Sequence, residues 1–282
     1  MTLRIPRGMK LVNLLLGSWT TVIMVFLYLP IVILIVYSFN TSRSNIHWEG
    51  FTFDWYHKMW HDTPLIDSVK VSLIIASIVT VLSVVLGTLG AWLLYRYRFP
   101  FPRLTNTLIF IPMVIPEIIM GVSLLIFFAV VNSWGNGLLE RLHITSENPL
   151  SLGMTTVIIA HVTFCFPFVL IAVQARLEGV DPSLEEAAMD LGATPMKAFL
   201  YVMVPYLLPA IISGALMSFT LSMDELIVTY FTSSSRSQTL PMVIFGRVKK
   251  GLDPSLNAVS ALFILATATL VVAAEWIKKW NR

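Results

Sequence analysis

The chain has 282 residues, of which 56% are hydrophobic and only 12% are charged, and its mean hydropathy is +0.79. These values are typical of an integral membrane protein and exclude an ordinary soluble domain. The net charge of +3 does not indicate nucleic-acid binding, because the basic residues stand at the ends of apolar runs and form no patch. The single cysteine, Cys165, excludes an intrachain disulfide and a cysteine-based metal site.

Six apolar segments predict an all-α integral membrane protein with a single transmembrane domain over residues 1–282. The expected spans are 11–39, 69–95, 108–131, 152–175, 206–231 and 258–277. The first segment is too long for the apolar part of a signal peptide, so a retained helix is favoured. The connection 40–67 is rich in aromatic residues, which is typical of a loop lying along the membrane interface.

The third and fourth spans contain residues that are unusual in a lipid-facing helix. Pro112 and Pro116 predict that the third span is kinked or broken. Glu117 follows directly, and a carboxylate within a span usually faces a pathway or a partner, although here it can also simply mark the helix break. His161 stands alone in the fourth span, where a packed, hydrogen-bonded histidine is favoured over a metal ligand.

A polar segment, residues 176–205, separates the fourth and fifth spans and should lie outside the membrane. Asp181-Pro182-Ser183 predicts a helix start near residue 182, and Gly192 can end that helix in a left-handed conformation. Thr194-Pro195 is a second start signal. Within the first helix one apolar stripe is expected, formed by Leu184, Ala187, Ala188 and Leu191, with Glu185, Glu186 and Asp190 away from it.

This segment resembles the signature loop of ABC importer permeases, which reads Glu-Ala-Ala, three residues, Gly, nine residues, then Ile-x-Leu-Pro. The chain has Glu186-Ala187-Ala188, Gly192 and Val202-x-Val204-Pro205, so it departs only by two valines. The resemblance implies the six-helix type I importer permease fold, with a cytoplasmic coupling helix that docks on a separate ATP-hydrolysing subunit. The expected coupling residues are Glu185, Glu186, Ala187, Ala188, Gly192 and Pro195. The alternative is a capped surface helix without a partner.

Asp224 and Glu225 are consecutive carboxylates near the end of the fifth span. Adjacent helical residues point about 100° apart, so only one of the two can occupy the centre of a given face. One therefore faces a pathway while the other caps, pairs or binds a partner; the alternative is that both mark the headgroup end of the helix.

Within the importer permeases, the run 218–225 together with residues 161–165 and 185–195 is similar to the second membrane subunit of spermidine/putrescine transporters. That subfamily commonly has a second Asp where this chain has Glu225. The resemblance implies a polyamine substrate, which Asp224, Glu225 and Glu117 would attract by charge and Tyr230 and Phe231 by cation–π contact. It also implies a second homologous permease in a heterodimer, two copies of the ATPase, and a periplasmic or lipid-anchored polyamine-binding protein.

Six spans place both termini and the polar segment on one side, and eleven of the 19 Lys and Arg residues lie there. The positive-inside rule makes that side the cytoplasm, and the resemblance implies that the membrane is a bacterial inner membrane. Against the rule, Arg236, Arg247, Lys249 and Lys250 cluster in the last outer connection, and the sequence assigns them no role.

No phosphate-binding Gly-x-x-x-x-Gly-Lys-Ser/Thr loop is present, so the chain is not its own ATPase, and no enzyme activity, cofactor or metal is expected. An importer of another small solute, such as an amino acid, an iron chelate or thiamine, would share the architecture. An ion-coupled secondary transporter would need no ATPase, and the polar segment argues against it. An intramembrane enzyme is disfavoured because no nucleophile and base can be paired.

Overall fold

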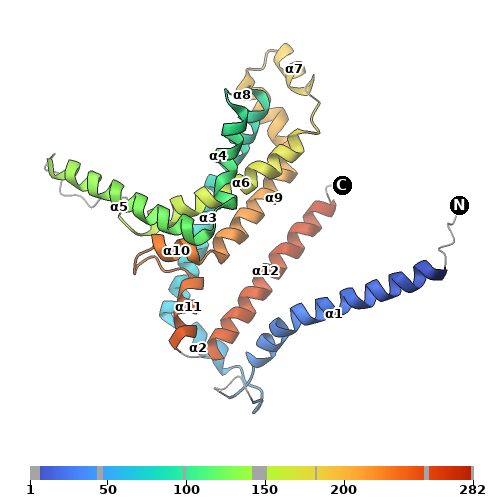
Figure 1. Cartoon of the computed structure of the whole chain (residues 1–282), viewed down its shortest axis with the longest axis vertical. Helices are drawn as coiled ribbons and strands as arrows, with labels where there is room; N and C mark the ends of the chain where they lie inside the picture. Colours follow the sequence, from blue (N-terminus) through green and yellow to red (C-terminus); the bar gives the residue numbers. More distant parts are fainter. Residues whose placement is uncertain are drawn as a thin grey trace. The chain divides into compact units, whose positions relative to one another are not determined.

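The structure is a computed structural model, and it describes residues 7–42, 47–97, 100–141, 151–181, 183–250 and 254–280. Over these ranges the chain is helical, and its strand-like pairing is an isolated bridge between Asn40 and Phe51. In chain order the helices are α1 (Arg7–Tyr37), α2 (Asp54–Trp60), α3 (Thr63–Arg96), α4 (Pro102–Val114), α5 (Glu117–Arg141), α6 (Met154–Leu177), α7 (Ser183–Asp190), α8 (Pro195–Ala198), η1 (Phe199–Met203), α9 (Val204–Asp224), α10 (Ile227–Thr232), α11 (Leu240–Lys250) and α12 (Pro254–Trp280) (Figure 1).

Each predicted span lies mostly within helices. In the described part of the chain, five helical stretches are long and apolar enough to cross a membrane, namely Val12–Tyr37, Thr63–Arg96, Glu117–Gly135, Met154–Leu177 and Pro195–Asp224, and a shorter apolar stretch covers Pro254–Thr269. The third predicted span is divided between α4 and α5. Ile115 is extended (φ −67°, ψ 131°) because the proline that follows it disfavours the helical conformation. The predicted break at this proline is confirmed.

The fifth predicted span, 206–231, is wrong as a single helix. Helix α9 ends at Asp224, Glu225 is extended (φ −70°, ψ 111°), and α10 begins at Ile227. No proline or glycine stands at this break, so the local sequence gives no signal for it.

By its internal contacts the chain divides into two compact units, residues 1–62 with 247–269 and residues 63–246 with 270–282. In the first unit, the aromatic connection after α1 folds on itself. The Trp55 indole N–H donates to the Asn40 carbonyl at 2.6 Å, and the Phe39 and Phe51 rings stack with centroids 5.2 Å apart. Arg247, one member of the unexplained basic cluster, forms two charge-assisted hydrogen bonds with Asp62, one of them 2.7 Å long.

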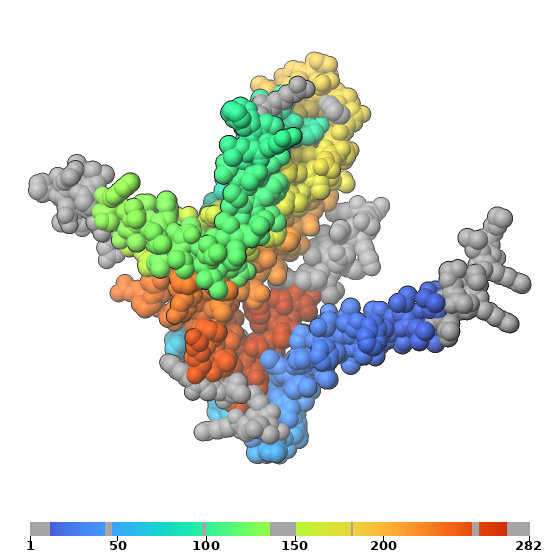
Figure 2. Space-filling view, viewed as in Figure 1, coloured from blue at the N-terminus to red at the C-terminus, as the bar shows by residue number. Residues whose placement is uncertain are grey.

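The second unit is built on three long helices, α3, α6 and α9, which pack on one another. Close approach is possible because Gly87 and Gly214 face Val169: a Cβ on Gly87 would lie 2.7 Å from the Val169 Cβ. Helix α4 packs on α6, α10 on α5, and α7 on α8 and η1. In the space-filling view α7 and α8 form the surface at one end of this unit (Figure 2).

Candidate functional site

The polar segment folds as two short helices, as predicted. The Asp181 carboxylate accepts the Ser183 N–H at 3.0 Å at the start of α7, and this hydrogen bond lowers the pKa of Asp181 below its usual value. Asp181 is thus the capping residue, and Pro182 lies outside the described residues. Gly192 ends the turn with φ +89°, the left-handed region that glycine tolerates best.

The second start signal is confirmed as well. The Thr194 hydroxyl accepts the Lys197 N–H at 3.4 Å, and exposed Pro195 is the first residue of α8. The π-helical turn η1 then joins α8 to α9. Its first residue, Phe199, is buried with its ring centroid 4.4 Å from that of Trp92 in α3. The short helices are therefore attached to the transmembrane bundle by an aromatic contact at this joint.

The apolar stripe of α7 points away from the unit to which the helix belongs. Leu184 is 43% exposed, Leu191 is 90% exposed and Ala187 is also exposed. Ala188 is half-buried. Glu186 is exposed beside this stripe. An exposed stripe of this kind is typical of a helix that another protein covers.

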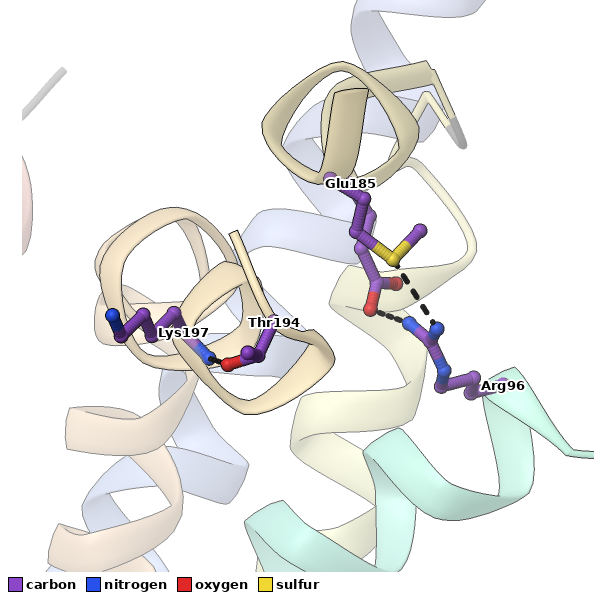
Figure 3. Close-up of polar contacts among 5 residues, drawn as sticks. Arg96, Glu185, Thr194 and Lys197 are labelled. Carbon is purple, nitrogen blue, oxygen red and sulfur yellow. Dashed lines mark hydrogen bonds and ion pairs between the residues drawn. The ribbon is translucent and has the colours of Figure 1, made fainter. Parts of the chain in front are cut away.

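Glu185 differs from the other expected coupling residues because its side chain points inward. It is only 7% exposed and forms an ion pair with Arg96 at the end of α3 (Figure 3). Glu185 and Glu186 are adjacent in a helix, so the turn of about 100° between them separates an inward from an outward carboxylate. The sequence grouped both glutamates on the docking surface and did not single out Arg96 as a partner.

A second group of acidic residues lies where helices are interrupted. Glu117 is the first residue of α5, Asp224 is the last of α9, and Glu225 lies in the break before α10. Helices α5 and α10 pack together, and the carboxylates of Glu117 and Asp224 lie within electrostatic range of the Glu225 carboxylate. The structure therefore places Glu117 of the third predicted span near Asp224 and Glu225 of the fifth.

These three carboxylates differ in exposure. Glu117 and Asp224 are exposed, whereas Glu225 is only 6% exposed and accepts the Val228 N–H at 2.8 Å, which caps the first turn of α10. In the described part of the chain, none of the recorded ion pairs includes any of the three. Among the described residues, therefore, no ion pair supplies these three carboxylates with a neutralising basic side chain.

The two aromatic residues expected in the pathway are placed differently. Tyr230 is 59% exposed, while Phe231 is half-buried against Gly121 of α5, where a Cβ would lie 2.7 Å from the phenylalanine ring. The two rings meet edge to face with centroids 5.6 Å apart. Tyr230 is thus accessible to a ligand, and Phe231 mainly packs α10 on α5.

His161 joins the two sides of the α9–α10 break. Its imidazole is fully buried, with Nδ1 2.9 Å from the Ser222 hydroxyl and Nε2 2.7 Å from the Thr229 hydroxyl. Thr229 donates its only hydroxyl hydrogen to the Glu225 carbonyl at 2.8 Å, so it must accept from His161. Nε2 therefore carries the hydrogen, and Nδ1 accepts from Ser222.

The packed, hydrogen-bonded role predicted for His161 is confirmed, and the network adds Ser222 and Thr229, which sequence reasoning had not selected. Among the residues that the structure describes, no group of three His, Cys, Asp or Glu side chains is arranged to hold a metal ion.

Comparison with known families gives one match over most of the chain. Residues 83–281 match a family model described as "Binding-protein-dependent transport system inner membrane component". Among characterised proteins, the chain is 37% identical to the spermidine/putrescine transport system permease protein PotC of Haemophilus influenzae, covering 94% of this chain and 96% of the relative. It is 39% identical to the putrescine transport system permease protein PotI of Escherichia coli, covering 92% and 90%.

Solved structures match the same architecture. The structure of a bacterial ABC transporter involved in the import of the acidic polysaccharide alginate aligns over 100% of both chains with a TM-score of 0.71 and 14% identity. An amino acid ABC transporter with histidines aligns over 81% of this chain and 99% of that chain, with a TM-score of 0.53 and 18% identity. At these identities the likeness shows the fold alone.

Proposed function

The chain belongs to the binding-protein-dependent transport system inner-membrane components, and from this premise we propose that it is a permease subunit of an ATP-driven polyamine importer. Its fold is that of the ABC importer permeases, and members of the family are membrane transport subunits rather than enzymes. Spermidine and putrescine are the proposed cargo, because they are named for relatives that match almost the whole chain.

The observation that carries the cargo proposal is the acidic group Glu117, Asp224 and Glu225, which has no basic partner among the recorded ion pairs of the described residues. A linear polycation would neutralise it by charge-assisted hydrogen bonds. Exposed Tyr230 adds an aromatic face that can stabilise an ammonium group, and Phe231 holds α10, which carries Tyr230, against α5.

The proposed complex contains this chain, a second homologous permease, two copies of an ATPase subunit and an external binding protein. Two of the exposed helix surfaces support such an assembly. Helix α1 has apolar side chains exposed along its described length, which suits lipid or the partner permease, and the outward stripe of α7 suits the ATPase. The proposed coupling residues at the docking surface are Glu186, Ala187, Ala188, Gly192 and Pro195. Glu185 contributes from the buried side of α7 through its ion pair.

We place α7 and both chain termini on the cytoplasmic side of the bacterial inner membrane. The excess of Lys and Arg on that side supports this orientation. Of those basic residues, Arg4, Arg98 and Arg282 lie outside the described residues. Both compact units are included in one transmembrane domain.

The experiment that tests this function is transport by the whole complex in vesicles. The chain should copurify with an ATPase. Reconstituted vesicles supplied with binding protein should accumulate spermidine or putrescine only when ATP is present on the side of the membrane where α7 lies. Excess unlabelled polyamine should compete, and a neutral amino acid of similar length should not. Uptake that continues without ATP, or purification without any ATPase, would favour the ion-coupled alternative. Competition by the amino acid alone would move the cargo to another class.

A further inference from the structure

Helix α7 is too short to hold its own position. It has eight residues, and its contacts among the described elements are mainly with α8 and η1, which follow it in the chain. Isolated helices of this length are unstable in water, so α7 depends on contacts with its surroundings. A mechanical signal received by α7 therefore needs a defined connection to the long helices.

Arg96 provides such a connection. It is the last residue of α3, and its guanidinium forms the ion pair with Glu185 while a second nitrogen lies 3.6 Å from the Met189 sulfur (Figure 3). Met189 follows Glu185 by four residues, so both side chains lie on the same face of α7. The arginine thus contacts that face at two points one helical turn apart.

The surroundings of Arg96 fix the direction of its side chain. The guanidinium centre lies 5.7 Å from the Trp92 ring and 5.8 Å from the Tyr97 ring, which is the range of cation–π contacts. The Arg96 side chain is 20% exposed and that of Glu185 is 9% exposed, so solvent screens the pair only weakly. Trp92 in turn packs on Phe199, so both ends of the segment from α7 to η1 meet the last turns of α3.

We propose that Arg96 is a positioning residue that locks α7 to α3 through Glu185, so that movement imposed on α7 by the ATPase is delivered to the bundle of α3, α6 and α9. This inference rests on the proposed function. It separates the two glutamates: Glu185 connects α7 to its own subunit, and Glu186 remains available to the partner.

The test compares ATP hydrolysis with transport in the assembled complex. Arg96→Ala and Glu185→Gln should still bind the ATPase through the exposed face of α7, yet the amount of polyamine imported per ATP hydrolysed should fall at least about five-fold, within the usual range of coupling between sites. Because both variants break the same contact, the double variant should be no worse than either single one. Arg96→Lys keeps the charge but not the second contact with Met189, so its loss should be smaller.

Arg103→Ala is the matched control, because it removes an exposed arginine from the adjacent helix α4. It should keep the wild-type ratio of import to hydrolysis. A wild-type ratio in Arg96→Ala and Glu185→Gln, or additive losses in the double variant, would overturn the proposal while leaving the importer function intact. If Arg96→Ala fails to accumulate in the membrane, Arg96→Lys and Glu185→Gln decide the question by the same ratio. A wild-type complex that imports no polyamine would instead refute the proposed function.

Discussion

Two pairs of consecutive acidic residues, Glu185-Glu186 in α7 and Asp224-Glu225 at the end of α9, share one arrangement. In each pair one side chain is buried and its neighbour is exposed. The electrostatic surroundings of the two buried carboxylates, however, differ. Glu185 has a full counter-charge in Arg96, whereas Glu225 has the backbone N–H of Val228 and two further carboxylates nearby.

Under the proposed function, this difference separates a structural joint from a site for a cation. The charges of a carboxylate and its paired arginine largely cancel at a distance. The inward side of α7 therefore presents little net charge to a cation. Carboxylates that face one another without a cation repel, and a bound polycation would relieve that repulsion. Under the proposed function, the same local pattern of two acids would serve coupling in one region and cargo binding in the other.

The largest expected effect is on the outward member of the coupling pair. Glu186→Lys should leave the protein in the membrane and abolish uptake, because a reversed charge on the exposed face of α7 opposes docking of the ATPase without touching the spans. Copurification of the ATPase and vesicle uptake measure it. Asp67→Lys makes the same charge change at an exposed residue of α3 outside the coupling segment and should transport normally. Normal copurification and normal uptake in Glu186→Lys would contradict the docking role.

The next effect is on the outward member of the pathway pair. Asp224→Asn keeps the shape and the hydrogen-bonding capacity but removes the charge, so uptake should fall at least several-fold, since a charge-assisted contact is worth roughly 1.5–3 kcal/mol. Basal ATP hydrolysis and the yield of complex should survive, which distinguishes a pathway defect from a folding defect.

Glu225→Gln is the comparison within that pair. Its amide oxygen can still accept the Val228 N–H, so the cap of α10 is retained while the charge is lost. Because Glu225 is buried and its carboxylate is already engaged, the fall in uptake should be smaller than for Asp224→Asn. The reverse order would make Glu225 the main contact with the cation, and unchanged uptake in both variants would remove the pair from the pathway.

The two regions also differ in how far the sequence predicts them. The start and end of α7, the start of α8 and the break before Pro116 follow from capping residues, glycine and proline, whose effects act within a few positions. These features were therefore predictable without knowledge of the packing.

The break at Glu225 and the ion pair of Arg96 with Glu185 depend on residues that are distant in the sequence. His161 reaches partners 61 and 68 positions away, and Arg96 pairs with a residue 89 positions away. No local pattern encodes such pairings, so the sequence predicted a continuous fifth span and placed both glutamates of α7 on the surface. The three carboxylates proposed for the pathway, Glu117, Asp224 and Glu225, nonetheless lie at helix ends next to the packed pair α5 and α10. A carboxylate inside a span usually has a partner or a path, but whether these residues line one stays a prediction.

The smallest expected effect tests whether the end of α7 is specified as locally as this comparison implies. Gly192 has φ +89°, and a Cβ at this position would meet no atom within 4 Å, so Gly192→Ala should suffer only the backbone cost of a left-handed residue, about 1–2 kcal/mol. Such a local cost frays the end of α7 without removing its docking face, and uptake should fall less than in Asp224→Asn. Gly192→Asn is the matched variant, because asparagine adopts the left-handed conformation more readily, and its uptake should lie closer to wild type. If both variants lose transport as completely as Glu186→Lys, then backbone conformation is not the reason for glycine at position 192. The absence of a side chain would instead be required by close approach of the ATPase.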